Sequence, residues 1–443
     1  MLPYMILLYM KIDKLRQDDH NVCMKMPSLF LRLFLTGLLA ASLGGLTSCR
    51  GGSNTAVLWT DRPELAFYAQ YFNASQDRFK VEVRYFESTA QRLTESTEHP
   101  DIVVASWLRS ASTRGLFRPL DSLFSRDGLD SASFYPPLLA LGQMGRRQYL
   151  IPVNFNIPAI VFAREFSDNH SNPFTIEMEE IKERGKAFNN VSNRAFTRMG
   201  FSPLSNAEFL FIVANFFGAG FREASPIAWN THAMEQAVAW IQQWITEANE
   251  SIQMEDDFAS KFYFEPPERL ISSGRVLYTH MNSSRFFTLP EDRRKNLDFR
   301  WIAANDMIPL DEWGVYFGIH KRTRARGAAE AFAQWFFTAE TQRMLLEEKR
   351  RKRLNETSFG IAGGFSAMRT VTEQVFPQFY PSLLGRMPPD NFLTPTNILP
   401  RNWVAIKERV VLPYLRDRAR HPGQHEIRPL ERRIIDWYRL NRG

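Results

Sequence analysis

Cysteine is scarce in this sequence, which has only Cys23 and Cys49 among 443 residues. Two thiols are too few for a disulfide framework or for a cysteine-rich zinc site. The sequence also lacks His-Glu-x-x-His, Gly-x-Ser-x-Gly, a phosphate-binding loop and a dinucleotide fingerprint. His421 and His425 are separated by Pro422-Gly423, which prevents the two imidazoles from sharing one helical face. We therefore expect no metal, no cofactor and no enzymatic activity.

An excess of one charge sign is also missing. The chain has 55 Lys and Arg residues against 48 Asp and Glu residues, a formal net charge of +7. This moderate excess is compatible with an anionic membrane surface as well as with nucleic acid. Because the chain has no zinc-finger spacing, RNA-binding signature or alternation of basic and aromatic residues, we expect no nucleic-acid partner.

The apolar segment near the N-terminus is too short for a comfortable membrane span. Residues 33–42 are apolar, follow the basic start at Met24-Lys25-Met26 and end in Leu46-Thr47-Ser48-Cys49. Such a segment is typical of a secretory signal, which would occupy residues 1–48. Residues 1–23 carry mixed charges ahead of it, and we interpret them as a mis-assigned upstream start.

The end of this signal resembles the bacterial lipobox. In that motif a cysteine, here Cys49, is diacylated and becomes the N-terminus of the mature protein. Two acyl chains anchor a protein stably where one does not. We therefore expect an exported protein anchored to the cell envelope by lipid at Cys49; the alternative is an uncleaved helical anchor with an incidental cysteine.

The length of the chain favours two lobes, since 443 residues exceed what one hydrophobic core usually organises. Short apolar runs predict strands at 56–59 and 101–106, and alternating apolar residues predict a strand at 80–86; helical patterns at 62–72 and 89–97 separate the three. This βαβαβ order predicts an open parallel sheet with helices on both faces.

Ligands of open α/β sheets bind beyond the carboxyl ends of the strands. Trp59, Trp107 and Trp313 lie at predicted strand ends, where an indole can stack on a ligand. For Trp59, which is on the strand itself, packing in the core is the favoured interpretation, whereas the cleft is favoured for the other two. Trp229, in a loop before a helix, fits either role.

Several polar residues at strand ends and turns are candidates for hydrogen bonds to a polar ligand. The alternative for each is ordinary turn chemistry. Arg285 would suit a carboxylate or a phosphate, or it could form a surface salt bridge. The candidates are Asp61, Asn154, Asn156, Asn282, Ser283 and Arg285.

Later segments predict further elements. Ser205, Thr231 and Thr338 are expected to cap helices at their N-termini, because each precedes a helical apolar pattern. Strands are expected at 276–281 and 313–319.

The order of the segments resembles the extracellular solute-binding proteins of ABC importers, in the group typified by maltose-binding protein. Each motif is short, and their order supplies the specificity. The residues that carry the resemblance are the lipobox at Cys49, Val57-Leu58-Trp59-Thr60-Asp61, Pro100-Asp101-Ile102-Val103-Val104, Gly115-Leu116-Phe117-Arg118-Pro119-Leu120-Asp121, Tyr149-Leu150-Ile151-Pro152 and residues 328–346.

The resemblance implies an α/β, two-lobe periplasmic-binding-protein fold of type II. Each lobe would be an open, mostly parallel sheet flanked by helices. Lobe one would comprise 49–157 and 314–353, and lobe two 158–313 and 354–443. The hinge would lie where the chain crosses near Asn156 and Trp313.

The resemblance also implies a function. The protein would be a monomer that captures a small polar ligand, sugar-like or other, by hinge closure and delivers it to an ABC transporter permease. Sugar binders of this group often place a tryptophan where this chain has residues 282–286, Asn-Ser-Ser-Arg-Phe, which argues against a malto-oligosaccharide. The alternatives are a secreted lipoprotein enzyme acting on glycosides and a surface lipoprotein or adhesin with the same fold.

Overall fold

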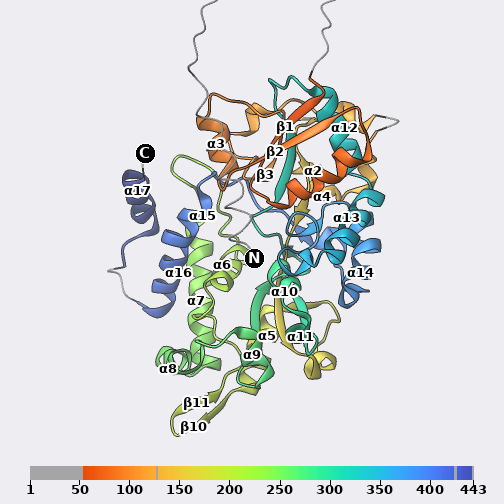
Figure 1. Cartoon of the computed structure of the whole chain (residues 1–443). Helices are drawn as coiled ribbons and strands as arrows, with labels where there is room; N and C mark the ends of the chain where they lie inside the picture. Colours follow the sequence, from red (N-terminus) through yellow and green to blue (C-terminus); the bar gives the residue numbers. More distant parts are fainter. Residues whose placement is uncertain (1–52, 126–127, 424–426, 442–443) are drawn as a thin grey trace, which may run out of the picture. The chain divides into compact units, whose positions relative to one another are not determined.

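The computed structural model describes residues 53–125, 128–423 and 427–441. The predicted signal region and Cys49 lie outside the described residues. Two β-sheets, the first at the top of Figure 1 and the second at the bottom, organise this part of the chain. No helix within the described ranges combines the length and the apolar character that a membrane span requires.

The first sheet confirms the predicted βαβαβ order. Its elements are β1 (Thr55–Thr60), α2 (Glu64–Ser75), β2 (Lys80–Tyr85), α3 (Thr89–Glu95) and β3 (Ile102–Ser106). Strand β1 pairs in parallel with both β2 and β3. Two later strands, β15 (Val315–Ile319) and β6 (Ile151–Pro152), add antiparallel partners, which gives the order β2-β1-β3-β15-β6.

Alternation along the strands decides which side chains each face buries. Leu58 and Val104 face a core that includes side chains of α2 and α12 (Arg326–Phe336). Trp59 and Val103, each adjacent to one of these residues along its strand, face the opposite side with Leu93 of α3. Trp59 is therefore a core residue in edge-to-face contact with Phe86, and its prediction as a ligand contact is corrected.

The second sheet has the order β12 (Thr279–Asn282), β8 (Pro158–Ala163), β13 (Leu297–Ala303) and β9 (Thr175–Glu177). Only the pairing of β13 with β9 is parallel, so the expectation of mostly parallel pairing is wrong for this sheet. The reason is the path of the chain: β8 carries it away from the first sheet, whereas β12 and β13 run back beside β8 toward the crossover.

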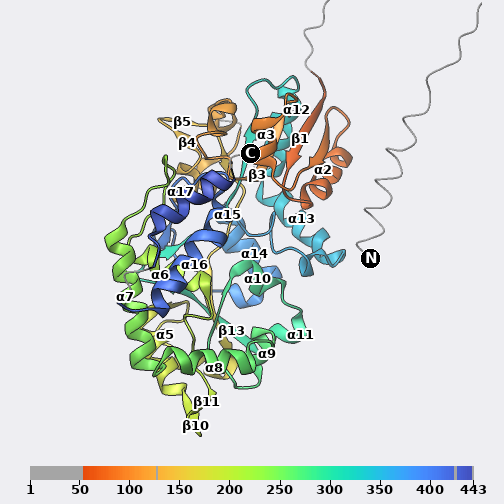
Figure 2. The ribbon, with the colours of Figure 1, turned by 90° about the vertical axis from the view of Figure 1, so that its left-hand side faces the viewer.

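Helices cover the side of the second sheet that Ile160 and Phe162 face. They are α5 (Met178–Phe188), α6 (Ala207–Phe216), α7 (Thr231–Ala248), α15 (Trp403–Ile406), α16 (Leu412–Arg420) and α17 (Leu430–Leu440), and Figure 2 shows α6, α7 and α16 side by side. Thr338 caps α13 (Ala339–Arg351) as predicted. Asn206 and Asn230, not Ser205 and Thr231, cap α6 and α7, because their side-chain oxygens reach the backbone N–H three residues on.

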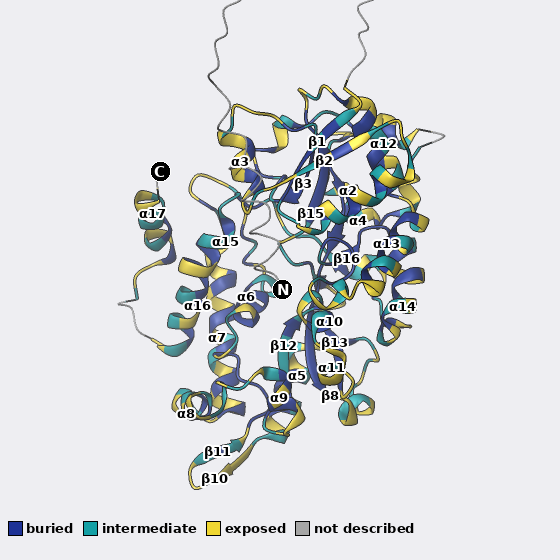
Figure 3. Cartoon of the chain, viewed as in Figure 1, coloured by how far each residue is buried: buried dark blue, intermediate teal, exposed yellow. Residues whose placement is uncertain are grey.

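One apolar cluster runs continuously across a face of both sheets, and Figure 3 shows the buried strands that contribute to it. Phe365 links its two ends, because its ring contacts both Phe155 and Trp301. Strand β16 (Phe365–Ser366), placed in lobe two by the predicted boundaries, pairs with β7 (Asn154–Phe155), placed in lobe one. The exact division of the chain into lobes stays a prediction.

A buried carboxyl group in α8 (Ile252–Phe262) should make stability depend on pH. Glu255 is 1% exposed and accepts a hydrogen bond from Asn249 Nδ2 at 2.7 Å, and burial raises its pKa to about 7. The folded state therefore holds this proton more tightly than the unfolded chain does. The stabilising effect is complete below the unfolded pKa near 4.5 and is lost as the pH rises through about 7.

We expect Glu255→Gln to remove most of this dependence. The difference in unfolding free energy between pH 5 and pH 8, measured by urea titration, should shrink by on the order of 2 kcal/mol. The exposed Glu87→Gln variant is the control and should leave the profile unchanged. Identical profiles for Glu255→Gln and the parent protein would contradict the assignment.

Candidate functional site

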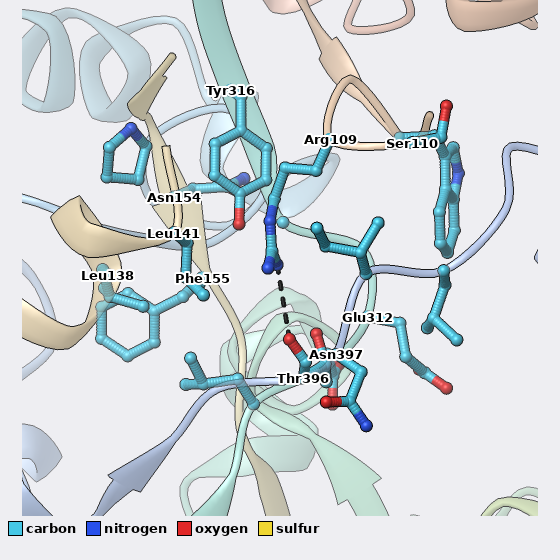
Figure 4. Close-up of a pocket in the computed structure, with 17 residues that line it drawn as sticks. Arg109, Ser110, Leu138, Leu141, Asn154, Phe155, Glu312, Tyr316, Thr396 and Asn397 are labelled. Carbon is cyan, nitrogen blue, oxygen red and sulfur yellow. Dashed lines mark hydrogen bonds between the residues drawn. The ribbon is translucent and has the colours of Figure 1, made fainter. Parts of the chain in front are cut away.

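A cleft lies between the two sheets and consists of three adjoining chambers. Leu310 and Glu312 line all three. The two larger chambers have volumes of about 300 Å³ and 200 Å³, and the third is a narrow passage of about 30 Å³. Figure 4 shows the narrow passage, where side chains from the first sheet, from the crossover at Asn154 and Phe155 and from the segment 396–399 face each other.

The turn that follows β3 forms part of the wall on the side of the first sheet, and the turn that follows β1 supports it. Asp61 Oδ2 accepts a hydrogen bond from the backbone N–H of Ser106 at 3.0 Å, and Arg62 Nη2 donates to Ser106 Oγ at 2.6 Å. Burial raises the pKa of Asp61, and neighbouring Arg62 opposes that rise. Asp61 lines none of the three chambers; it braces the turn that carries Trp107.

Trp107 has an unusual backbone for a bulky residue, with φ of 65°. Its carbonyl accepts hydrogen bonds from Ser110 N at 3.4 Å and Thr113 Oγ1 at 3.2 Å, which hold this conformation. Strained backbone of this kind is concentrated at binding sites. The indole packs against the cores of both sheets and therefore lies at their junction.

Trp313 meets Trp107 edge to face, with 5.6 Å between ring centroids. Trp313 is 41% exposed and lines the 300 Å³ chamber, while Trp107 lines the narrow passage. The structure thus brings together two tryptophans that are far apart in the sequence. Both line the cleft, which is the location favoured for them by the sequence.

Arg109 crosses the narrow passage. Its Nη1 donates to the backbone oxygen of Thr396 at 3.4 Å, and its guanidinium lies 5.8 Å from the centre of the Tyr316 ring (Figure 4). Its Nε has no hydrogen-bond partner among the described residues. An arginine with an unsatisfied donor in a cleft is suited to bind an oxygen atom of a ligand.

Lys407 forms the charged floor of the 300 Å³ chamber. It is buried, and its Nζ lies 2.6 Å from Glu208 Oε2 and 3.0 Å from Glu312 Oε1. Its ammonium group also lies 4.3 Å from the centre of the Phe211 ring. Burial lowers the pKa of Lys407, but the two carboxylates outweigh burial and raise it overall. The lysine is therefore held as a cation.

Four more polar residues line the same chamber. Asn282 Nδ2 donates to Asp311 Oδ2 at 2.9 Å, and its own oxygen caps α10 (Ser283–Thr288). Burial, reinforced by Glu312, raises the pKa of Asp311 to about 6. Burial lowers the pKa of His280 to about 3, and its Nε2 has no partner among the described residues. Arg285 is exposed at the rim.

Asn154, Asn156 and Ser283 are buried bracing residues. Asn154 Nδ2 donates to Ala362 O at 2.6 Å, and Asn156 Nδ2 donates to Gly363 O at 3.0 Å. Ser283 Oγ donates to Asn156 Oδ1 at 2.7 Å. Asn154 and Asn156 thus connect the crossover to residues 362–363, and Ser283 supports Asn156. Asn154 also lines the narrow passage. Direct hydrogen bonding to a ligand stays a prediction for these three.

The structure therefore groups Trp107, Trp313, Asn282 and Arg285 in the cleft. Trp229 lies elsewhere, stacked on Phe221 at 6.1 Å in the core beside the second sheet. Sequence reasoning missed several residues that line the cleft. A charge within two residues of a predicted aromatic contact could have indicated Arg109, Asp311 and Glu312, but no local signal marks the others: Glu208, His280, Tyr316, Thr396, Asn397 and Lys407.

Comparison of the sequence with protein families supplies a match over most of the chain. The model described as bacterial extracellular solute-binding protein matches residues 68–351. A comparison with curated protein sequences finds no match.

Solved structures with the same fold share little sequence with this chain. The sugar-binding protein MalE from Xanthomonas citri has a TM-score of 0.62 at 12% identity, over 88% of this chain and 100% of that one. A cyclo/maltodextrin-binding protein complexed with maltotetraose has a TM-score of 0.59 at 16% identity, over 89% and 99%. The ABC substrate-binding protein Lmo0181 from Listeria monocytogenes, in complex with cycloalternan, has a TM-score of 0.56 at 13% identity, over 86% and 96%. They place the chain in the predicted two-lobe class.

Proposed function

Because the chain belongs to the family of bacterial extracellular solute-binding proteins, we propose that its cleft captures an oligosaccharide and delivers it to an ABC importer. Membership in this family makes the chain an exported binding protein and not an enzyme, so the alternative of a glycoside-active enzyme is set aside. Sugar binding by MalE and by the cyclo/maltodextrin-binding protein supports the choice of ligand class.

The Trp107–Trp313 pair in a cleft of polar side chains is the observation that carries this proposal. A sugar ring presents apolar C–H faces that stack on indole and hydroxyl groups that need hydrogen-bond partners. Arg109 and Arg285 supply donors, Glu312 supplies acceptors, and all three line the cleft.

Closure of the two lobes over the ligand is the proposed mechanism. The two crossing segments lie side by side, since the Asp311 N–H donates to Asn156 O at 2.9 Å, which suits a hinge at this position. A ligand that contacts both walls stabilises the closed form in proportion to the contacts that it makes only there. A monomer is sufficient for this mechanism, because both walls belong to one chain.

A panel of α- and β-linked di- to tetrasaccharides, titrated against intrinsic tryptophan fluorescence, tests the proposal. We expect a saturable change for at least one member, because closure removes water from the two indoles. Maltotetraose is included, since the sequence 282–286 argues against it. Absence of binding across the panel, with no hydrolysis product formed, would direct the search to other solutes.

Anchoring by lipid at Cys49 is the second part of the proposal, and it rests on the sequence Leu46-Thr47-Ser48-Cys49. Cys49→Ala is expected to leave an unprocessed precursor that incorporates no fatty-acid analogue, because the acceptor thiol is gone. Ser53→Ala, changed just after the signal, is the control and should be labelled normally. Equal labelling of Cys49→Ala and the parent protein would disprove the anchor.

A further inference from the structure

A second cavity, of about 580 Å³, opens in the half of the molecule that holds the second sheet and shares no lining residue with the cleft. It lies among α10, α11 (Glu291–Arg294), the start of β13 and the turn 380–386 that follows α14 (Phe376–Phe379). Figures 1 and 2 both show α10, α11 and α14 close together. The proposed capture of a sugar leaves this cavity unexplained.

Cations outnumber carboxylates around it. Four basic side chains line the cavity against two acidic ones, Glu291 and Asp298. Asp298 already accepts a hydrogen bond from Ser167 Oγ at 2.6 Å and pairs with Arg300 at 3.2 Å and with Arg386. Burial alone would raise the pKa of Asp298, but these donors lower it. Its charge is thus neutralised by partners and does not offset the remaining cations.

Three of the lining cations form no ion pair with any described residue. Arg294 Nη1 donates to Phe287 O at 2.7 Å, and Arg164 Nη2 donates to Leu297 O at 3.3 Å. No carboxylate of the described residues lies within 4.0 Å of Arg164, Arg294 or Lys295. Arg294 is half-buried, and loss of solvent lowers its pKa; Tyr380 and the lining carboxylate Glu291, which makes no ion pair with it, offset only part of this effect. A partly desolvated cation without a contacting anion is unfavourable, and a bound anion would relieve this.

Apolar surface adjoins the cations. Phe286, Leu297 and Tyr380 are buried side chains of the cavity lining, and Leu384 stands at its edge with 75% of its surface exposed. A ligand that satisfies both features has an anionic group and an apolar body.

We propose that this cavity is a second ligand site, which binds an organic anion with a phosphate or carboxylate group attached to an apolar body. Arg294 and Lys295 contact the anionic group, and Leu384 contacts the apolar body. The ligand could be a free molecule or the head of a membrane lipid, since both present the same chemistry. The proposal does not depend on what the cleft binds.

Titration calorimetry with phenyl phosphate tests the site. We expect saturable binding that Lys295→Glu weakens roughly tenfold or more, because a charge-assisted contact becomes a repulsive one. Lys295 is exposed and unpaired within the described part of the chain, so this variant should fold normally. Lys80→Glu, an exposed change of the same charge on β2, is the matched control and should bind like the parent protein.

Two further measurements test the contact with the apolar body and the source of the ligand. Leu384→Ser should weaken phenyl phosphate severalfold and leave inorganic phosphate unaffected. Co-sedimentation with phosphatidic acid vesicles, compared between Lys295→Glu and Lys80→Glu, distinguishes a lipid source from a free one. Absence of binding to both probes, or equal loss in Lys295→Glu and Lys80→Glu, would overturn the proposal. Titration of the same variants with the sugar panel tests the cleft independently of this cavity.

Discussion

Lys407→Met is expected to lower the free energy of unfolding by about 3–5 kcal/mol, the usual effect of removing one partner of a buried ion pair. The substitution leaves Glu312, whose side chain is 8% exposed, without its cation and next to the half-buried Asp311. Methionine fills a similar volume, so a packing defect is a small part of the effect. Urea unfolding at neutral pH measures the change.

The double variant Lys407→Met, Glu312→Gln separates charge from packing. Neutralising Glu312 removes the stranded carboxylate, and we expect most of the lost stability to return. Lys321→Met is the control. It changes an exposed lysine that follows β15 of the first sheet, and it should have little effect. If Lys407→Met were as stable as the parent protein, the buried ion cluster would not be part of the folded cleft.

Trp107→Ala and Trp313→Ala are each expected to weaken binding of the panel sugar roughly ten- to a hundredfold, corresponding to about 1–3 kcal/mol of lost stacking and burial. The two rings meet in the cleft, where a ligand would cover them. Fluorescence titration, or calorimetry where the remaining tryptophans give no signal, measures the affinity. The melting temperature of Trp313→Ala should stay close to that of the parent, because its ring is 41% exposed.

Trp59→Ala is the matched control for these two variants. The same side chain is lost, but from a core position that is 1% exposed, so we expect a stability loss of about 3–5 kcal/mol. Opposite behaviour, with Trp313→Ala strongly destabilised and its affinity unchanged, would place that ring in the core and contradict the proposed site.

The sequence alone determined the three parallel strands of the first sheet, whereas the antiparallel pairing of β15 and β6 came only from the structure. Strands β1, β2 and β3 are short apolar segments that alternate with helices, and this local periodicity is sufficient to predict parallel pairing. The rule that ligands lie beyond such strands also selected Trp107, which lines the narrow passage; its contact with a ligand stays a prediction. The fold class followed from the order of the segments.

Only the tertiary structure decided the second sheet and the charged part of the cleft. The antiparallel pairing of β8 with β12 and β13 depends on where the chain returns, which no local pattern records. Glu208, Glu312 and Lys407 are far apart in the sequence. Folding brings the Lys407 ammonium group within 3.0 Å of a carboxylate oxygen of each glutamate. The hydrogen bond from Ser283 to Asn156 was also not predictable from the sequence, because it joins two buried polar groups that only the fold brings together; ligand binding by the two residues stays a prediction.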